Sequence, residues 1–298
     1  MSVAHFELHT TLTQPRAHGS TVRFLRALIS RPEGAFGVAC VCLLLFTALF
    51  ATLIAPYDPI KLNVLERLQA PSLAHLMGTD QLGRDVLSRI IFGTQTALVA
   101  AASALAFSLA GGLVLGLIAG YGPRLVDTAL LLLFDSVKSL PVIIMALALV
   151  TLLGPSLTTV VIVVVVFTLP GYARMVRSQT QVLKRSEYVL AARAMGASPG
   201  RILLRHILPN LFGPLIVLVC MDVTTVITVE SGLAFIGLGA QPPTPSWGSI
   251  LNDGFSFIQQ AWYLVAAAGL PIVIATIGFN FLGEAIRDVL DPKNGGTP

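Results

Sequence analysis

Long apolar stretches with few or no charged residues alternate with shorter polar segments along most of the chain. An α-helix needs about 20 mostly apolar residues to cross a bilayer, and six stretches approach or exceed that length. The predicted membrane-spanning helices cover residues 34–55, 96–120, 126–153, 157–172, 211–233 and 262–282. The fourth contains the uninterrupted apolar run 160–166, which is predicted to lie in a lipid-facing helix. The expected fold class is therefore an all-α integral membrane protein with six transmembrane helices.

The composition excludes a soluble protein of this size. Of the 298 residues, 55% are hydrophobic and 11% are charged, and the mean hydropathy is +0.82, whereas soluble domains carry about 25% charged residues. With the N-terminus in the cytoplasm, the predicted inner segments hold 14 Lys and Arg residues and the outer segments hold four. Cytoplasmic loops carry such an excess, so we expect both termini in the cytoplasm. The net charge of +4 then follows from topology, and no nucleic-acid partner is predicted.

The chain divides into an N-terminal cytoplasmic tail, residues 1–33, and one transmembrane domain, residues 34–298. The largest predicted cytoplasmic segment of this domain, about 174–209, lies between the fourth and fifth predicted spans. One interpretation of this segment is a solvated loop whose arginines reflect only the usual excess of positive charge on the cytoplasmic side. The pattern of helix caps inside it favours a second interpretation.

Two capped helices are predicted in this cytoplasmic segment. The first begins near Glu187 and ends at Gly196, a glycine in the C′ position. The second has Ser198 as its N-cap and Pro199 in its first turn, and is expected to stop at Pro209. A solvated loop needs no such caps, and a DNA-reading helix pair would not be tethered between two spans. The helix pair is therefore predicted to dock a cytoplasmic partner.

The first outer segment, residues 56–93, combines opposite charges at helical spacing. Asp80 lies four residues before Arg84, and Asp85 lies four residues before Arg89, in the order that favours ion pairs along a helix. Thr79 or Asp80 could cap such a helix. The segment is predicted to contain a helix that lies in the outer membrane interface.

The second outer segment, residues 237–261, has prolines at three of the four positions 242–245, which favour stiff extended backbone. Trp247, Trp262 and Tyr263 lie in or beside this segment. Tryptophan and tyrosine are enriched where a membrane meets water. These three side chains are therefore predicted to belong to an aromatic belt at the outer interface.

Four charged residues in the predicted spans are candidates for function, because charge at membrane depth is costly. Asp135 and Lys138 lie three residues apart on one helix face, so they either pair with each other or line a transport path. Asp222 lies near mid-depth of the fifth span without a sequence-local partner, and either lines the path or pairs with another helix. Glu230 lies about 12 Å further toward the outer surface, where a gate would be expected.

Nothing in the sequence has the pattern of a catalytic, cofactor or metal site. No GxxxxGK[ST] phosphate-binding loop is present, so energy for transport has to come from a partner. An HExxH motif is also absent. The three cysteines lack CxxC spacing, and the five histidines form no metal-binding pattern. We therefore expect neither enzymatic activity nor a cofactor.

Several motifs resemble those of one transporter family. The cytoplasmic motif consists of Leu190, Ala191, Ala192, Gly196, Ile207, Leu208, Pro209 and Asn210. The outer motifs consist of Gly78, Thr79, Asp80, Gly83, Arg84, Asp85, Pro243 and Trp247. Taken together, these motifs resemble those of ABC importer permeases, specifically the C-type subunit of the dipeptide, oligopeptide and nickel branch. One position departs from the family pattern: Leu190 stands where an acid is usual, and Glu187 lies one turn earlier.

The resemblance implies a type I ABC importer permease fold in the bacterial inner membrane, with a homologous permease supplying the other half of the pathway. It implies that two ATP-binding subunits dock on residues 187–209 and that a periplasmic binding protein delivers a di- or oligopeptide to the outer loops. An ion-coupled secondary transporter that uses Asp222 and Glu230 is the alternative. A membrane receptor or scaffold is a third reading, and the absence of a recognisable soluble sensor domain disfavours it.

Overall fold

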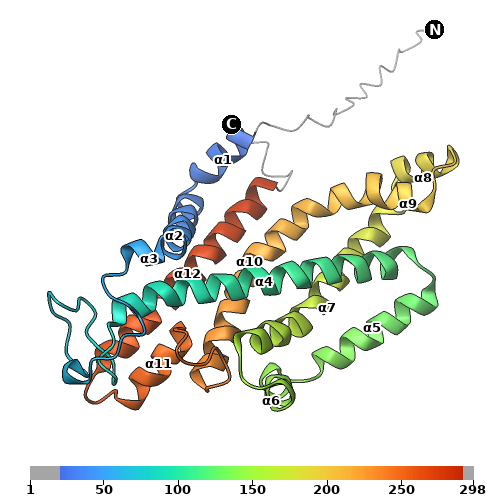
Figure 1. Ribbon diagram of the computed structural model, residues 1–298. Coiled ribbons are helices and arrows are strands. Elements are labelled where there is room, and N and C mark those ends of the chain that lie inside the picture. The colour runs from blue at the N-terminus through green and yellow to red at the C-terminus, as the bar shows by residue number, and fades with distance from the viewer. Residues whose placement is uncertain (1–20, 291–298) are drawn as a thin grey trace, which may run out of the picture.

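The computed structural model describes residues 21–290, which form a helical bundle (Figure 1). Within this range the only extended pairing is a bridge between Thr79 and Asp85, so the predicted all-α class is confirmed. Most of the predicted tail, residues 1–20, lies outside the described part of the chain. The helices are α1 (Thr21–Ile29), α2 (Pro32–Leu49), α3 (Ala51–Ile54), η1 (Val64–Glu66), α4 (Val86–Tyr121), α5 (Arg124–Lys138), α6 (Val142–Leu153), α7 (Leu157–Leu183), α8 (Glu187–Ala194), α9 (Pro199–Ile202), η2 (Leu203–Ile207), α10 (Leu208–Phe235), α11 (Trp247–Ser256) and α12 (Trp262–Leu290).

In the described part of the chain, five helices are long and apolar enough to cross a bilayer: α2, α4, α7, α12 and the continuous helix made by α9, η2 and α10. The sixth predicted span is present as a bent pair, because α5 and α6 meet at 88°. Pro141 explains the bend, since proline lacks the N–H that a helix interior needs and disfavours helical backbone at Leu140. Six spans are therefore present if the bent pair counts as one, and the prediction of one uninterrupted apolar helix over 126–153 is wrong.

Helices α4 and α7 pack closely along most of their length. On α4, Gly112, Gly116 and Gly120 recur every four residues and so share one helix face. A Cβ on any of them would lie between 2.3 and 2.6 Å from an atom of α7. The two backbones can approach this closely because these positions are glycine, as is common between membrane helices.

The valine run of α7 lies inside the bundle. Val160, Val163 and Val164 are at most 1% exposed and belong to the main hydrophobic core, which corrects the prediction that this run faces lipid. Hydropathy cannot separate the two environments, because lipid tails are as apolar as a neighbouring helix. The helix also continues to Leu183 instead of ending at Tyr172 as predicted.

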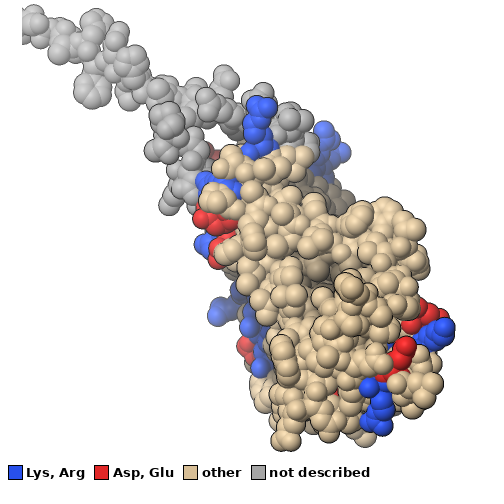
Figure 2. Space-filling view, turned by 90° about the vertical axis from the view of Figure 1, so that its left-hand side faces the viewer, with Lys and Arg blue, Asp and Glu red and all other residues tan. Residues whose placement is uncertain are grey.

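Helix α12 packs against both α2 and α10, and all three of these helices contact α4. Gly37 of α2 lies against the backbone of Gly278 and Leu282 in α12, a second close approach that depends on a small residue. Figure 2 shows a broad uncharged surface with charged side chains at its margins. This distribution is expected of a face that meets lipid.

Candidate functional site

The predicted docking element, here called the coupling segment (residues 187–209), has the expected first turn. Helix α8 ends at Gly196, which has φ +81°. The Gly196 N–H donates to the Arg193 carbonyl at 3.0 Å, and the Ala197 N–H donates to the Ala192 carbonyl at 3.1 Å. These are the two bonds of a Schellman motif. A Cβ at Gly196 would meet no atom within 4 Å, so the backbone conformation alone selects glycine.

The second helix of the coupling segment begins as predicted and ends differently. Ser198 accepts the Arg201 N–H at 3.4 Å, and Pro199 occupies the first turn. The helix then passes through the π-helical turn η2 into α10, so it does not stop at Pro209. Proline is tolerated there because the π turn ends at this point and the first turn of a helix needs no N–H donor. A displacement of the coupling segment can therefore pass directly into a membrane span.

Part of the coupling segment is buried and part faces outward. Of the predicted contact residues, Ala192 and Ile207 are buried and Leu208 is half-buried. The exposed ones are Glu187, Ala191, Gly196 and Pro209. Leu190 of the predicted motif is also exposed, and large exposed apolar side chains that the sequence analysis did not identify are Tyr188, Met195 and Leu204. Apolar side chains gathered on one surface mark sites of protein contact.

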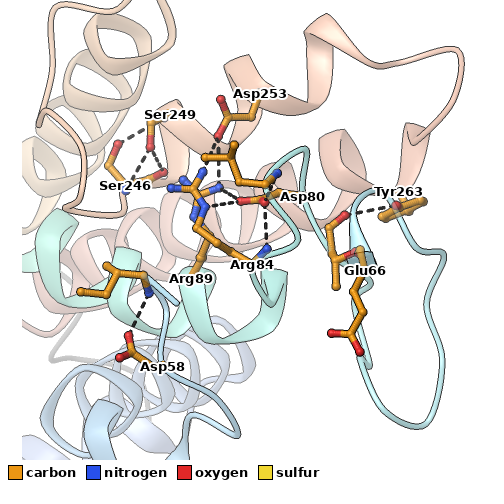
Figure 3. Close-up of polar contacts among 12 residues, drawn as sticks. Asp58, Glu66, Asp80, Arg84, Arg89, Ser246, Ser249, Asp253 and Tyr263 are labelled. Atoms are coloured by element: carbon orange, nitrogen blue, oxygen red, sulfur yellow. Dashed lines mark hydrogen bonds and ion pairs between the residues drawn. The ribbon is translucent and has the colours of Figure 1, made fainter. Parts of the chain in front are cut away.

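Asp80 is the centre of a buried polar cluster near the other end of α4 (Figure 3). Its carboxylate accepts hydrogen bonds from the Nε of Arg84 at 2.7 Å and from Arg89. It also accepts the N–H groups of Leu82 at 2.8 Å and Arg84 at 3.0 Å. Asp253 of α11 lies 3.1 Å from the Arg89 guanidinium and 3.5 Å from that of Arg84. Two carboxylates thus compensate two buried arginines, as buried charges require.

The helix predicted to begin near Asp80 begins later, at Val86. Asp85 is its N-cap and accepts the Ser88 N–H at 2.8 Å. The predicted pair between Asp85 and Arg89 is therefore wrong: Asp85 lies 2.9 Å from the Nδ1 of His75, and Arg89 turns to Asp80. Helical spacing failed here because a capping carboxylate faces the helix end rather than the next turn.

Thr79 and two glycines shape the loop that holds Asp80. The Thr79 side-chain oxygen accepts the Gln69 N–H at 2.9 Å, and the Thr79 carbonyl accepts the Tyr263 hydroxyl at 3.2 Å. Gly78 and Gly83 have φ of +75° and +72°. A Cβ at Gly83 would lie 1.7 Å from a backbone oxygen, so this motif position excludes every other residue.

Trp247 lies in the protein core and not in an aromatic belt. Its side chain is fully buried, and its Nε1 donates to the Ile90 carbonyl of α4 at 3.1 Å. Tyr263 is also buried, whereas Trp262 is exposed as the belt prediction requires. Pro243 lies at the rim of an open groove of about 700 Å³ that Tyr57 also lines. The outer motif therefore connects α4, α11 and α12 into one packed unit.

Two of the charges predicted within the bundle have partners on α7. Asp135 accepts a hydrogen bond from Arg174 at 2.7 Å, and the Lys138 ammonium lies 3.6 Å from the centre of the Phe167 ring. The alternative in which Asp135 and Lys138 pair with each other is therefore wrong.

Asp222 and Glu230 differ in their surroundings although both belong to α10. Asp222 is half-buried. Glu230 is fully buried; its Oε2 accepts the Ser231 hydroxyl at 3.3 Å, and its Oε1 has no hydrogen-bond partner among residues 21–290. Asp222 can therefore meet a solute beside the bundle, whereas Glu230 is enclosed in this conformation.

Within residues 21–290 no three His, Cys, Asp or Glu side chains are placed to hold a metal ion. The contacts that the sequence analysis missed are those that join distant segments, such as Arg89 with Asp253 and Asp127 with Arg177. No local pattern could have paired them, because 164 and 50 positions separate the partners.

Comparison with known proteins identifies a matching family and several proteins of similar sequence. The family described as binding-protein-dependent transport system inner membrane component matches residues 112–295. The dipeptide transport system permease protein DppC of Alkalihalophilus pseudofirmus is 39% identical over 86% of this chain and 84% of its own. The di/tripeptide transport system permease protein DppC of Pseudomonas aeruginosa is 38% identical, over 86% and 87%. The glutathione transport system permease protein GsiD of Pectobacterium atrosepticum is 39% identical, over 91% and 89%.

A solved structure supports the fold independently. A chain of the MetNI methionine ABC transporter, in an inward-facing conformation, matches with a TM-score of 0.56 at 19% identity. The match covers 68% of this chain and 97% of the other. The type I importer fold expected from the motifs is thereby confirmed, and the comparisons give no support to an ion-coupled secondary transporter.

Proposed function

The chain belongs to the inner-membrane components of binding-protein-dependent transport systems, and on this basis we propose that it carries di- or oligopeptides, including glutathione-like peptides. It is the transmembrane permease subunit of an ATP-driven ABC importer. The names of three relatives, which transport dipeptides, di/tripeptides and glutathione, support a peptide substrate. Permeases of this family reside in the inner membrane. The excess of Lys and Arg in the predicted inner segments supports cytoplasmic termini.

The coupling segment is the proposed docking site for two separate ATP-binding subunits. Its exposed face offers Glu187, Ala191 and Gly196, beside the apolar side chains of Leu190 and Met195. This face is the observation that carries the proposal, because large exposed apolar side chains outside the lipid need a protein partner. Glu187 supplies the carboxylate that position 190 lacks. ATP hydrolysis is assigned to those subunits, and no enzymatic step to this chain.

A homologous permease subunit is proposed to complete the pathway as a heterodimer. Asp222 and Lys138 lie half-buried on helices at membrane depth, where contact with lipid would be costly. A second subunit that covers Asp222 and Lys138 would enclose both charges in a polar path. Asp135 lies close to the same path through Arg174. Glu230, enclosed further along α10, is proposed to belong to the outer gate.

The outer segments that the Asp80 cluster holds together are proposed to form the surface to which a periplasmic binding protein delivers the peptide. The cluster joins α4, α11 and α12 through Arg89, Asp253 and Tyr263. A rigid outer surface favours docking, because little conformational freedom is lost on binding. The division into a cytoplasmic tail, residues 1–33, and a permease domain, residues 34–298, is part of the same proposal.

Reconstitution into proteoliposomes tests the proposal. The chain is assembled with a homologous permease, two ATP-binding subunits and a periplasmic binding protein, and uptake of a radiolabelled dipeptide is measured. We expect uptake that requires ATP, the binding protein and both permeases. Uptake by this chain alone under an ion gradient would contradict the proposal and support the ion-coupled alternative.

A further inference from the structure

Asp127 and Arg177 form a forked ion pair at the end of the bundle that carries the coupling segment. The Asp127 carboxylate, in the first turn of α5, accepts hydrogen bonds from the Nε of Arg177 and, at 2.7 Å, from its Nη2. Gln181 of α7 donates to the same carboxylate at 3.4 Å. Both members of the pair are mostly buried, at 15% and 23% exposure. Forked arginine–carboxylate pairs fix orientation as well as charge.

A second contact joins α7 to α4, about two turns further along α7. The Lys184 ammonium donates to the carbonyl of Gly120 at 3.2 Å and lies 5.6 Å from the centre of the Tyr121 ring. Gly120 and Tyr121 end α4, and a cation is favourable beside the free carbonyls of a helix C-terminus. Lys184 is the C-cap of α7, so only two residues separate it from Glu187 at the start of the coupling segment.

These contacts all lie on one side of a weak point in α7. Pro170 interrupts the helix, since its ring removes one hydrogen bond and crowds the preceding turn. A Cβ on the neighbouring Gly171 would meet no atom within 4 Å, so little packing supports the helix on that face. A force applied at the coupling segment would bend α7 at Pro170 unless the part after it were fastened elsewhere.

Helix α4 is the element to which this part of α7 is fastened. Its 36 residues form one uninterrupted helix, about 54 Å long at 1.5 Å per residue. It runs from the Asp80 cluster to the turn before Asp127 (Figure 1). Gly112, Gly116 and Gly120 bring α7 against it over two turns. Movement of the coupling segment can therefore reach the opposite end of the bundle through α4.

We propose that Asp127 and Arg177 are positioning residues for energy coupling: they clamp the part of α7 after Pro170, which is the stem of the coupling segment, to the first turn of α5, which follows α4 after the turn Gly122–Pro123. This inference rests on the proposed function of the coupling segment. With the clamp intact, α4 and the part of α7 after Pro170 move together when the ATP-binding subunits close. Without it, α7 bends at Pro170, and ATP is hydrolysed without a matching change at the outer end.

The test compares Asp127→Asn with Asp127→Glu in the complete reconstituted importer. The glycine contacts between α4 and α7 remain, so we expect both variants to insert and to retain the ATP-binding subunits. Asp127→Asn is expected to lower the number of peptides taken up per ATP by at least about fivefold, the lower range of measured couplings between sites. Asp127→Glu keeps the carboxylate and is expected to retain most of the wild-type number of peptides taken up per ATP.

A matched control separates clamping from the loss of any ion pair. Asp288→Asn removes the Arg31–Asp288 pair, whose atoms lie 2.5 Å apart between α2 and α12, and should leave the ratio unchanged. If Asp127→Asn fails to insert, Arg177→Lys takes its place in the test. This variant keeps the charge and loses the forked hydrogen bonds, so it is expected to lower the number of peptides taken up per ATP by the same factor.

Two outcomes would overturn the inference. One is a normal ratio in Asp127→Asn or, where that variant fails to insert, in Arg177→Lys. The other is a loss of the ATP-binding subunits from the complex, which would make the pair an assembly contact. Uptake by the wild-type importer without ATP would instead contradict the proposed function, and this inference with it.

Discussion

Arg89 and Asp253 are 164 positions apart in the chain, yet the Arg89 guanidinium donates to the Asp253 carboxylate at 3.1 Å. Arg89 lies in the first turn of α4 and Asp253 in α11, so this contact joins the beginning of one span to the segment that precedes another. Asp80 binds the same guanidinium from the loop before α4. Asp80, Arg89 and Asp253 thus form a junction between three segments of the outer motif (Figure 3). None of these residues predicts the junction when its own segment is read alone.

Replacement of Asp80 by Asn should destabilise this junction. The variant leaves Arg84 and Arg89 buried with only Asp253 to compensate them, and loss of one partner of a buried pair costs about 3–5 kcal/mol. We expect a clear fall in the melting temperature of the purified importer in detergent. Asp58→Asn is the control, because Asp58 is exposed and its carboxylate accepts the nearby Ile60 N–H. Equal melting temperatures for the two variants would show that the junction contributes little to stability.

The proposed orientation can be tested by cysteine labelling with a membrane-impermeant reagent. Thr79 and Ser246 lie in the predicted outer segments but are fully buried, so labels there would report burial and not sidedness. Leu73 is 99% exposed and is the better position. In a background with the exposed Cys42 replaced by Ser, Leu73→Cys should react from outside intact cells, and Ser198→Cys only after permeabilisation. The reverse pattern would invert the topology.

Features controlled by neighbouring residues could be predicted from the sequence. Gly196 and Ser198 follow rules of helix termination and capping that involve residues within one turn, and both expectations are confirmed. Helical spacing along the sequence was a less reliable guide to which charged residues form ion pairs. Asp135 and Lys138 share a helix face, but Arg174 of the neighbouring helix lies within hydrogen-bond distance of Asp135 and forms the pair instead.

Features that depend on neighbouring helices could not be predicted. Val160 is buried in the main core, although hydropathy predicted contact with lipid. Trp247 fills the core beside Gly93, although its residue type predicted a place at the membrane interface. A membrane helix is apolar on every face, so its pattern does not show which side is buried. The bend at Pro141 had a local signal, since proline ends helices, but the long apolar stretch obscured it.

Asp222→Asn should lower peptide uptake while the importer still assembles. The substitution removes the charge of a half-buried carboxylate at membrane depth and keeps the size of the side chain. Because Asp222 and Lys138 are both proposed to line one path, we expect Asp222→Asn and Lys138→Met to be non-additive, with an interaction energy of about 0.5–3 kcal/mol in a double-mutant cycle of uptake rates. Glu284→Gln, which alters an exposed carboxylate of α12, is the control. Normal uptake in Asp222→Asn would leave this residue a structural partner only.

Gly196→Val should separate the ATP-binding subunits from an otherwise intact permease. At φ +81° a residue with a side chain is strained by about 1–2 kcal/mol, and β-branched residues tolerate this region poorly. The strain is relieved if the Schellman turn opens, which would change the angle between α8 and α9 and disrupt the exposed docking face. The membrane spans do not depend on this turn, so insertion and pairing with the second permease should persist. Co-purification of the ATP-binding subunits and ATP-driven uptake measure the effect.

Gly200→Val is the matched control for this prediction. Gly200 lies four residues further on, in α9, and a Cβ there would also meet no atom within 4 Å. The two glycines differ in backbone conformation, since only Gly196 has positive φ. Gly200→Val should therefore retain the ATP-binding subunits where Gly196→Val loses them. If both variants bind those subunits and transport normally, the turn does not matter for docking and the coupling segment is a solvated connection. If both lose the subunits, added bulk on the exposed face is responsible and the conformational argument fails.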